Sequence, residues 1–156
     1  IGAGPPGLED EGFPQGHGSP LRARAGSRDL NVVDSSAWIE FFVDGPNARV
    51  FETPIRDSSA LLVPSIVVFE VYRYVLKLRG REMALAAVAT MRQGQAVPFD
   101  DALAVEAAEL SATRGLPLAD SIIYASATLH SATLWTQDAH FKGLEGVEYR
   151  TKPGAL

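Results

Sequence analysis

The stretch Gly115-Leu-Pro-Leu-Ala-Asp120-Ser-Ile-Ile-Tyr-Ala-Ser-Ala-Thr-Leu129 predicts an apolar, alanine-rich helix that carries a carboxylate at its start. The neighbours of Asp120 at helical spacing, Leu116, Ile123 and Tyr124, offer it no basic partner. A buried carboxylate without a partner takes up a proton rather than keep its charge. Either Asp120 caps the helix, since Asp is a preferred N-cap residue, or it belongs with other charges of the chain.

On both sides of this helix, apolar runs of strand length alternate with segments of helical period. The expected strands are 30–33, 61–63, 96–99, 133–135 and 147–149. The expected helices are 37–42 with Ser35 or Ser36 as cap, 48–56, 66–79 ending at Gly80, 82–92, 102–113 with Asp101 as cap, and 120–131. Such alternation predicts a three-layer α/β/α fold with a central, mostly parallel sheet of four to five strands.

Four acidic residues occupy related places in this pattern. Asp34 and Asp138 each lie just past the carboxyl end of an expected buried strand, where open parallel sheets form their ligand crevice. Glu70 lies in the helix after the second strand, and Asp120 opens the helix that leads to the strand before Asp138. Because right-handed crossovers bring those helix ends over the same edge of the sheet, we expect all four acids in one crevice.

Each acid could also have a purely structural role. Asp34 could cap a helix, and Glu70 could pair with Arg73 one turn further on. Asp138 could form a side-chain turn in the loop before Phe141. Together, however, four carboxylates in one crevice raise each other's pKa unless a cation neutralises them. Carboxylates and hydroxyls without cysteine or clustered histidine suit Mg²⁺ or Mn²⁺ better than zinc.

The composition limits the function classes. The 156 residues carry a net charge of −5 and contain no cysteine, which removes disulfides, thiolate metal sites and cysteine nucleophiles and fits the reducing cytoplasm. There is no run of eighteen apolar residues, so we expect no membrane partner. The negative net charge argues against broad, sequence-independent binding of nucleic acid, although it allows a local basic rim.

Residues 1–28 differ from the rest of the chain. They hold seven of the 14 glycines and four of the 10 prolines, and their apolar residues follow no period. We expect a disordered tail of artificial origin over 1–28, with no secretory signal, followed by one domain over 29–156. The alternative is a basic arm that binds a polyanion through Arg22, Arg24 and Arg28.

The four acidic segments resemble the motifs of a known family. They are Val33-Asp34-Ser35-Ser36, Pro64-Ser65-Ile-Val-Val-Phe-Glu70-Val, Leu116-Pro-Leu-Ala-Asp120-Ser-Ile-Ile and Thr136-Gln137-Asp138-Ala-His-Phe141. Their order and spacing over about residues 30–150 resemble the PIN-domain ribonucleases, in particular the VapC toxins of prokaryotic toxin–antitoxin pairs. Any one segment is a weak signal, whereas the four together are fairly specific.

The resemblance implies a PIN-like fold and a Mg²⁺-dependent endoribonuclease, the toxin of a type II toxin–antitoxin system, that hydrolyses structured RNA such as tRNA or rRNA. By the same resemblance, Asp34, Glu70, Asp120 and Asp138 are catalytic and hold one or two Mg²⁺ or Mn²⁺ ions, and Ser36 and Thr136 support the first and last acids. The implied partners are a cognate antitoxin, whose apolar helix enters a groove beside Trp38, Phe41 and Phe42, and a second copy of the chain in a homodimer.

Contacts with RNA are less well defined. Arg73, Lys77, Arg79 and Arg81 form a basic run at the end of the Glu70 helix. They could hold phosphates beside the metal site, or they could be a solvated helix end where cations favour the helix dipole. His140 could assist proton transfer, although an ordinary surface position is the stronger expectation.

Other enzyme and binding classes fit less well. A haloacid-dehalogenase-like phosphatase expects a second Asp where this chain has Ser36. A receiver domain expects a Lys near the site after a late strand, and none is placed there. A PIN nuclease of RNA processing remains an alternative, as does a catalytically inactive PIN binding module, which the presence of all four acids disfavours. A neighbouring antitoxin gene would distinguish the toxin from the processing nuclease.

Overall fold

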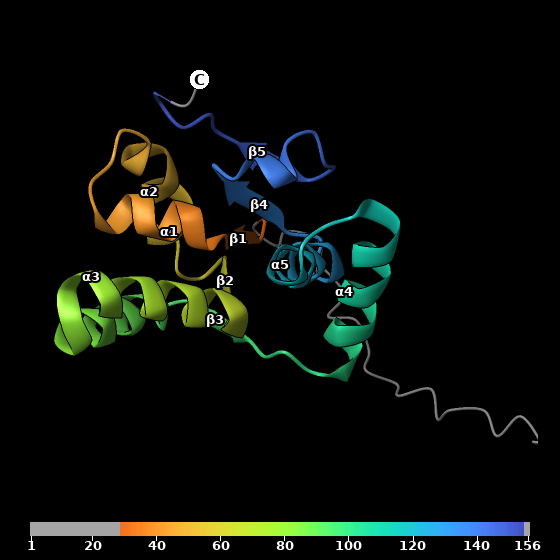
Figure 1. Cartoon of the computed structure of the whole chain (residues 1–156), viewed down its shortest axis with the longest axis horizontal. Coiled ribbons are helices and arrows are strands. Elements are labelled where there is room, and N and C mark those ends of the chain that lie inside the picture. Colours follow the sequence, from red (N-terminus) through yellow and green to blue (C-terminus); the bar gives the residue numbers. More distant parts are fainter. Residues whose placement is uncertain (1–28, 155–156) are drawn as a thin grey trace, which may run out of the picture.

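A computed structural model describes residues 29–154. The expected tail at 1–28 lies outside the described residues. Five strands form one sheet in the order β3-β2-β1-β4-β5, and every neighbouring pair is parallel (Figure 1). The strands are β1 (Asn31–Val33), β2 (Leu61–Pro64), β3 (Gln95–Val97), β4 (Thr133–Thr136) and β5 (Val147–Tyr149). The predicted parallel sheet is therefore confirmed.

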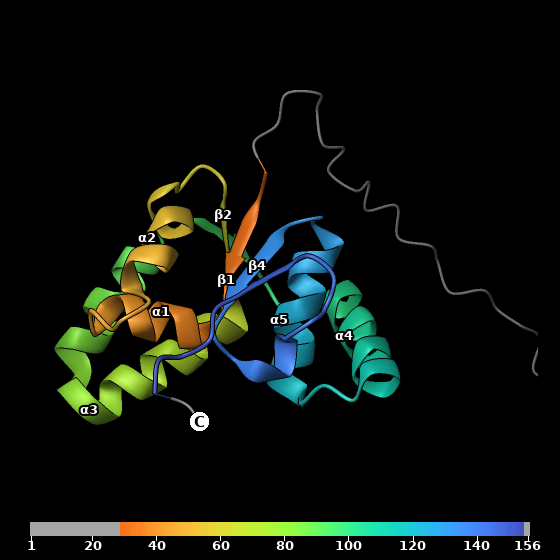
Figure 2. The same ribbon diagram turned by 90° about the horizontal axis from the view of Figure 1, so that it is seen from above.

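Helices cover both faces of this sheet. They are α1 (Ser35–Phe42), α2 (Ala48–Arg56), α3 (Ser65–Met91), α4 (Asp101–Arg114) and α5 (Leu118–Leu129), with a short 3₁₀ helix η1 (Ala139–Phe141). Figure 2 shows α1, α2 and α3 on one side of the strands and α4 and α5 on the other. The predicted three-layer α/β/α arrangement is confirmed. No helix within 29–154 is both long and apolar enough to cross a membrane.

The strand order creates a switch point between β1 and β4. From β1 the chain builds outward through β2 and β3, then returns to place β4 on the other side of β1. Val33 pairs with Trp135, and the Asp34 N–H donates to the Trp135 carbonyl at 3.1 Å. The carboxyl ends of β1 and β4 therefore lie side by side, at the place where open α/β sheets bind ligands.

The core explains the apolar runs of the sequence. Val32, Val33 and Leu134 are fully buried because helices cover both faces of the central strands. In α5, all residues from Ser121 to Ala127 are buried. The Ser121 and Ser126 hydroxyls donate to carbonyls of their own helix, so their burial leaves no unpaired hydroxyl.

Helix starts were the least accurate predictions. The cap of α1 is Asp34 rather than Ser35 or Ser36, and the cap of α4 is Asp100, which accepts from the Leu103 N–H, rather than Asp101. Helix α5 follows Pro117, so Asp120 lies inside its first turn and is not the cap. Adjacent polar residues are equally able to cap a helix, and the backbone conformation of the folded chain decides which of them does so.

The predicted break at Gly80 is confirmed. Helix α3 bends there because Gly80 has φ 82° and ψ 179°, a conformation that only glycine adopts readily. The first arm of α3 starts beside the sheet and carries Glu70. The second arm turns back toward β3 (Figure 2).

Candidate active site

Asp34 lies at the carboxyl end of β1 and is almost fully buried, with 2% of its surface exposed. Its Oδ1 accepts from the Ser36 hydroxyl at 2.7 Å and from the Ala37 N–H at 3.0 Å, and its Oδ2 accepts from the Thr136 hydroxyl at 2.9 Å. Burial raises the pKa of Asp34 to about 7. The charge of Asp138 also raises this pKa, whereas the three hydrogen bonds lower it. Oδ2 keeps a lone pair for a further partner.

Thr136 joins the ends of the two central strands through one hydroxyl group. While it donates to Asp34, the same oxygen accepts from the Asp138 N–H at 2.9 Å. Asp138 in turn accepts from the His140 N–H at 2.9 Å and caps η1. A short chain of hydrogen bonds, which starts after β1 and ends in η1, thus connects the first and last acids.

Asp120 faces this chain from the first turn of α5. Burial raises the pKa of Asp120 to about 6, and the charges of Asp138 and Glu70 raise it further while His140 lowers it. The Nδ1 atom of His140 lies 3.2 Å from Asp120 Oδ2 and 2.9 Å from Asp138 Oδ1. Within 29–154, Asp120, Asp138 and His140 are the group whose possible ligand atoms all lie within 4.8 Å of one another.

Glu70 completes the site from the first arm of α3. Its Oε1 accepts from the Ser35 hydroxyl at 3.0 Å, and its charge acts on Asp120. Among the described residues there is no ion pair between Glu70 and Arg73, so the purely structural role considered for Glu70 is absent there. The four acids thus come from β1, α3, α5 and the end of β4, and they meet at one edge of the sheet.

The structural roles considered for Asp34 and Asp138 are present together with this convergence. Asp34 caps α1, and Asp138 forms the side-chain turn before Phe141. A capping role and a place in the site do not exclude each other, because a carboxylate oxygen accepts more than one hydrogen bond.

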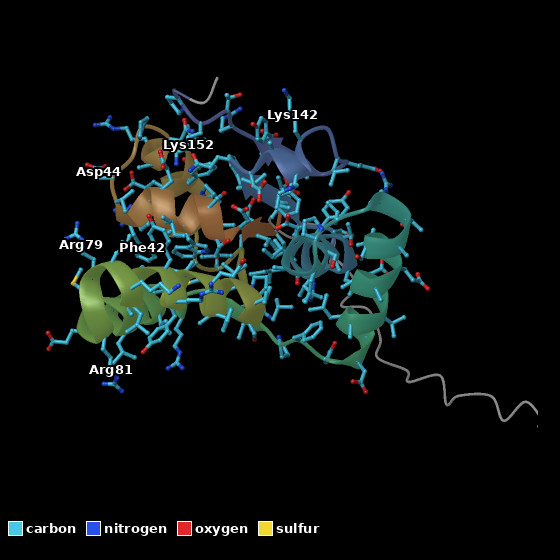
Figure 3. All side chains as sticks on the ribbon, in the orientation of Figure 1. Phe42, Asp44, Arg79, Arg81, Lys142 and Lys152 are labelled. Carbon is cyan, nitrogen blue, oxygen red and sulfur yellow. The ribbon has the colours of Figure 1, made fainter. Side chains whose placement is uncertain are left out.

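The basic run is not one continuous patch. All four of its residues are exposed. Figure 3 shows Arg79 and Arg81 at the far end of α3, pointing to opposite sides of the helix. Arg73 and Lys77 follow Glu70 by three and seven positions, so they share its helix face. These two residues are better placed to approach the acids than Arg79 or Arg81.

Two contacts of the site had no sequence signal. Ser35 holds Glu70 across two elements, and His140 lies between two acids although 61% of its side chain is exposed. Neither contact follows from the period of a helix or strand, because each depends on how two distant segments pack.

The donor atoms fit a hard divalent cation. They are carboxylate oxygens with adjacent hydroxyl groups and one imidazole, a set that suits Mg²⁺ or Mn²⁺. Within the described part of the chain, neither Lys nor Arg forms an ion pair with any of the four acids. Burial raises the pKa of Asp34 to about 7 and that of Asp120 to about 6, and the charge of Asp138 adds to both shifts.

Comparison with known proteins identifies the family and the fold. The family model of the PIN domain matches residues 32–147. No curated protein matches the chain. A toxin–antitoxin complex from Klebsiella pneumoniae has a similar structure, with a TM-score of 0.64, 23% identity, and coverage of 76% of this chain and 95% of that chain.

Two further solved structures are similar at lower identity. DNA-bound VapBC from Salmonella typhimurium has a TM-score of 0.62 and 17% identity, covering 79% of this chain and 98% of that one. VapC20 from Mycobacterium tuberculosis, described as a toxin that cleaves the sarcin–ricin loop, has a TM-score of 0.60 and 15% identity, covering 71% and 92%. These likenesses concern the fold, whereas the family model spans most of the sequence. The chain therefore belongs to the PIN domain family.

Proposed function

We propose that this PIN domain is a Mg²⁺-dependent endoribonuclease and the toxin of a type II toxin–antitoxin pair, acting on structured RNA in the cytoplasm. The observation that carries the proposal is the convergence of Asp34, Glu70, Asp120 and Asp138 without a compensating cation from the protein. Support also comes from the family, whose members are generally nucleases, and from the VapC-like fold of the similar solved structures.

The four acids would hold one or two Mg²⁺ ions, with Mn²⁺ as a substitute. A bound ion would lower the pKa of the attacking water and stabilise the leaving oxygen of an in-line displacement. Ser36 and Thr136 support Asp34 by fixing both of its oxygens, and Ser35 does the same for one oxygen of Glu70. Their task is to hold acceptors in place that would otherwise repel one another.

The chemistry is a hydrolysis in which the elements of water divide between two products. The oxygen of water bonds to phosphorus, the bond from phosphorus to the ribose 3′ oxygen breaks, and a proton ends on that 3′ oxygen. The products carry a 5′-phosphate and a 3′-hydroxyl. His140 Nδ1, placed between Asp120 and Asp138, is available to carry a proton during this exchange.

Recognition of RNA would use few basic side chains. Arg73 and Lys77 would hold phosphates beside Glu70, and their helical spacing from Glu70 supports this role. With a net charge of −5, the chain offers little general attraction for RNA, so the shape or loop sequence of a structured RNA such as tRNA or rRNA would supply the selectivity.

Two apolar surfaces fit the proposed protein partners. An antitoxin helix would cover exposed apolar side chains such as Val43, Leu78 and Met83. Phe42, the last residue of α1, lies on the side of α1 that faces α3 (Figure 3). Trp38 itself is fully buried and stacks on Phe42 at a centroid distance of 5.6 Å, so it would support this surface from below. A homodimer would use Leu118 and Val105 on α5 and α4, which are 77% and 62% exposed.

The test compares two aspartates in the first turn of a helix. Purified wild type, Asp120→Asn and the control Asp101→Asn are incubated with tRNA and rRNA in Mg²⁺ or in EDTA. We expect cleavage by wild type and Asp101→Asn in Mg²⁺ only, and none by Asp120→Asn, because Asp101 is exposed on α4 away from the site. Equal cleavage by all three proteins, or cleavage in EDTA, would refute the proposal.

Production of the protein in cells separates the toxin from a processing nuclease. A toxin should stop growth, and co-production of the antitoxin, a small protein encoded by a neighbouring gene, should restore growth. A processing nuclease would cleave RNA in the tube without stopping growth.

A further inference from the structure

A second group of hydrogen bonds, separate from those of the four acids, holds Gln137, the residue between Thr136 and Asp138. The Gln137 side chain donates from Nε2 to Glu40 Oε2 at 3.2 Å and to the Ser36 carbonyl at 3.5 Å. Its Oε1 accepts from Asn47 Nδ2 at 3.1 Å. These contacts join α1, the turn before α2 and the end of β4, although the residues are up to 101 positions apart.

Glu40 gives this group a direction. An ionised carboxylate only accepts hydrogen bonds, so the NH₂ end of Gln137 must face Glu40. The other oxygen of Glu40 accepts from the Asn47 N–H at 3.0 Å, while Asn47 Nδ2 also donates to the Thr151 carbonyl at 3.1 Å. This chain of hydrogen bonds runs from Glu40 through Gln137 and Asn47 to the Thr151 carbonyl, and both of its ends are acceptors. If the side-chain amide of Gln137 or Asn47 were turned over, some of these groups would lose their partners.

The carboxylate of Glu40 also has a space made for it. Glu40 is 4% exposed, and a Cβ atom at Gly45 would lie 2.3 Å from Glu40 Cδ. Gly45 is not among the residues with positive φ, so its backbone would accept another residue. The structure therefore requires glycine at position 45 because a side chain there would collide with the Glu40 carboxylate, not because of the backbone conformation.

Gln137 is connected to two of the acids, to Asp34 through Ser36 and to Asp138 through the backbone. Its N–H donates to the Ser36 hydroxyl at 3.4 Å, and that hydroxyl donates to Asp34 at 2.7 Å. The next residue along the chain is Asp138. A shift of Gln137 would therefore move the supports of the first and last acids together.

We infer that Glu40 and Gln137 are positioning residues that set the spacing between Asp34 and Asp138 and so the affinity of the site for a divalent ion. The inference rests on the proposed function. Neither residue needs to contact the ion or RNA. The C-terminal segment takes part through Thr151, and Figures 1 and 2 show this segment returning from β5 to the side of the sheet that carries α1 and α2.

Mn²⁺ titration by calorimetry on the full chain tests the inference without RNA. Glu40→Gln replaces one of two acceptor oxygens by an NH₂ group, which must then face a donor, either Gln137 Nε2 or the Asn47 N–H. Gln137→Leu removes the amide, and Gly45→Ala pushes on the Glu40 carboxylate. The double variant Glu40→Gln/Gln137→Glu restores an amide that faces a carboxylate, with the net charge unchanged. Gln93→Leu, at an exposed position after α3, is the matched control.

We expect each of the three single variants to lower Mn²⁺ affinity about tenfold, as loss of an outer partner does in metal sites. The double variant should recover most of the affinity, and the control should match wild type. Thermal melting of each protein shows that it is folded. For the single variants, raising the Mn²⁺ concentration should restore RNA cleavage, whereas it should not for Asp120→Asn.

The outcomes separate the two proposals. If wild type binds Mn²⁺ and cleaves RNA while the single variants bind equally well, the positioning inference alone is wrong. It is also wrong if the double variant recovers nothing, because the direction of the hydrogen bonds would then be irrelevant. If wild type binds no Mn²⁺ and cleaves no RNA, the proposed function fails and the positioning inference fails with it.

Discussion

Asp34 and Asp120 stand on opposite sides of the candidate site, and the fold uses them differently. Asp34 accepts three hydrogen bonds, caps α1 and is 2% exposed. Asp120 caps no helix, its Oδ2 lies 3.2 Å from Nδ1 of the exposed His140, and 14% of its side chain is accessible. Asp34 therefore combines a folding role with a place in the site, whereas burial of Asp120 gives the fold little. Substitutions should separate these roles.

The two acids share one property, which is a raised pKa. Three hydrogen bonds do not offset the burial of Asp34, so its pKa rises to about 7. Asp120 has a pKa of about 6 because burial acts together with the charges of Asp138 and Glu70. Both sides of the site therefore hold negative charge at neutral pH only at a cost in free energy, which a divalent ion would relieve.

The largest expected effect is on stability as a function of pH in EDTA. The folded pKa of Asp34 is raised from 3.8 to about 7, so its stabilising contribution is complete below pH 3.8 and is lost as the pH rises through 7. This loss can reach roughly 4 kcal/mol in the free energy of unfolding. Asp120 acts in the same direction between pH 3.8 and about 6.

Urea unfolding at several pH values measures this slope. Asp34→Asn should flatten it most, because an amide can still accept at Oδ1 from the cap donors but does not titrate. Asp120→Asn should flatten it less. An identical slope in wild type and Asp34→Asn would contradict the burial argument.

The second effect is on catalysis. Asp120→Asn should lower the rate of RNA cleavage at least about a hundredfold, since even outer partners of metal ligands change activity by about 10- to 100-fold. Its melting temperature in EDTA should stay equal or rise, because one of the repelling charges is removed. A fall of several degrees would show that the fold uses Asp120 after all.

The third effect concerns Thr136, the residue that links the two sides of the site. Thr136→Val leaves Asp34 Oδ2 without its donor and the Asp138 N–H without its acceptor. We expect a loss of about 1 to 3 kcal/mol in the free energy of unfolding, together with weaker Mn²⁺ binding. The control is Thr113→Val, whose hydroxyl donates only within its own exposed helix turn. Equal losses in both variants would remove the special role of Thr136.

The smallest effect should come from His140→Ala. The side chain is 61% exposed, so we expect a change within about 0.5 kcal/mol in the free energy of unfolding. The cleavage rate should fall by less than about tenfold, below the usual contribution of an essential general acid or base. A hundredfold loss at unchanged Mn²⁺ affinity would instead assign His140 an essential proton transfer.

The arrangement of the fold could be predicted further than its contacts. The parallel sheet and the break at Gly80 follow from hydrophobic period, helix-ending residues and crossover rules. The convergence of the acids follows from the places of Asp34 and Asp138 after β1 and β4. Glu70 and Asp120 lie in helices that the right-handed crossovers bring to the same edge. The cap of α4 was wrong because Asp100 and Asp101 are chemically equivalent from the sequence.

The contacts that hold the acids could not be predicted. The bond between Ser35 and Glu70 and that between Glu40 and Gln137 join residues 35 and 97 positions apart. Their formation depends on side-chain directions that are decided only when α1 packs against α3 and β4. In contrast, Ser36 and Thr136 could be selected by resemblance, and the structure places both against Asp34.

We propose that the four acids form a divalent metal site at which water hydrolyses RNA. The most direct test of this proposal is to map the ends of RNA cleaved by purified wild type and Asp120→Asn in Mg²⁺ and in EDTA. We predict new 5′-phosphate and 3′-hydroxyl ends with wild type in Mg²⁺ only. Ends that carry a 2′,3′-cyclic phosphate, or the same ends with Asp120→Asn, would contradict the account.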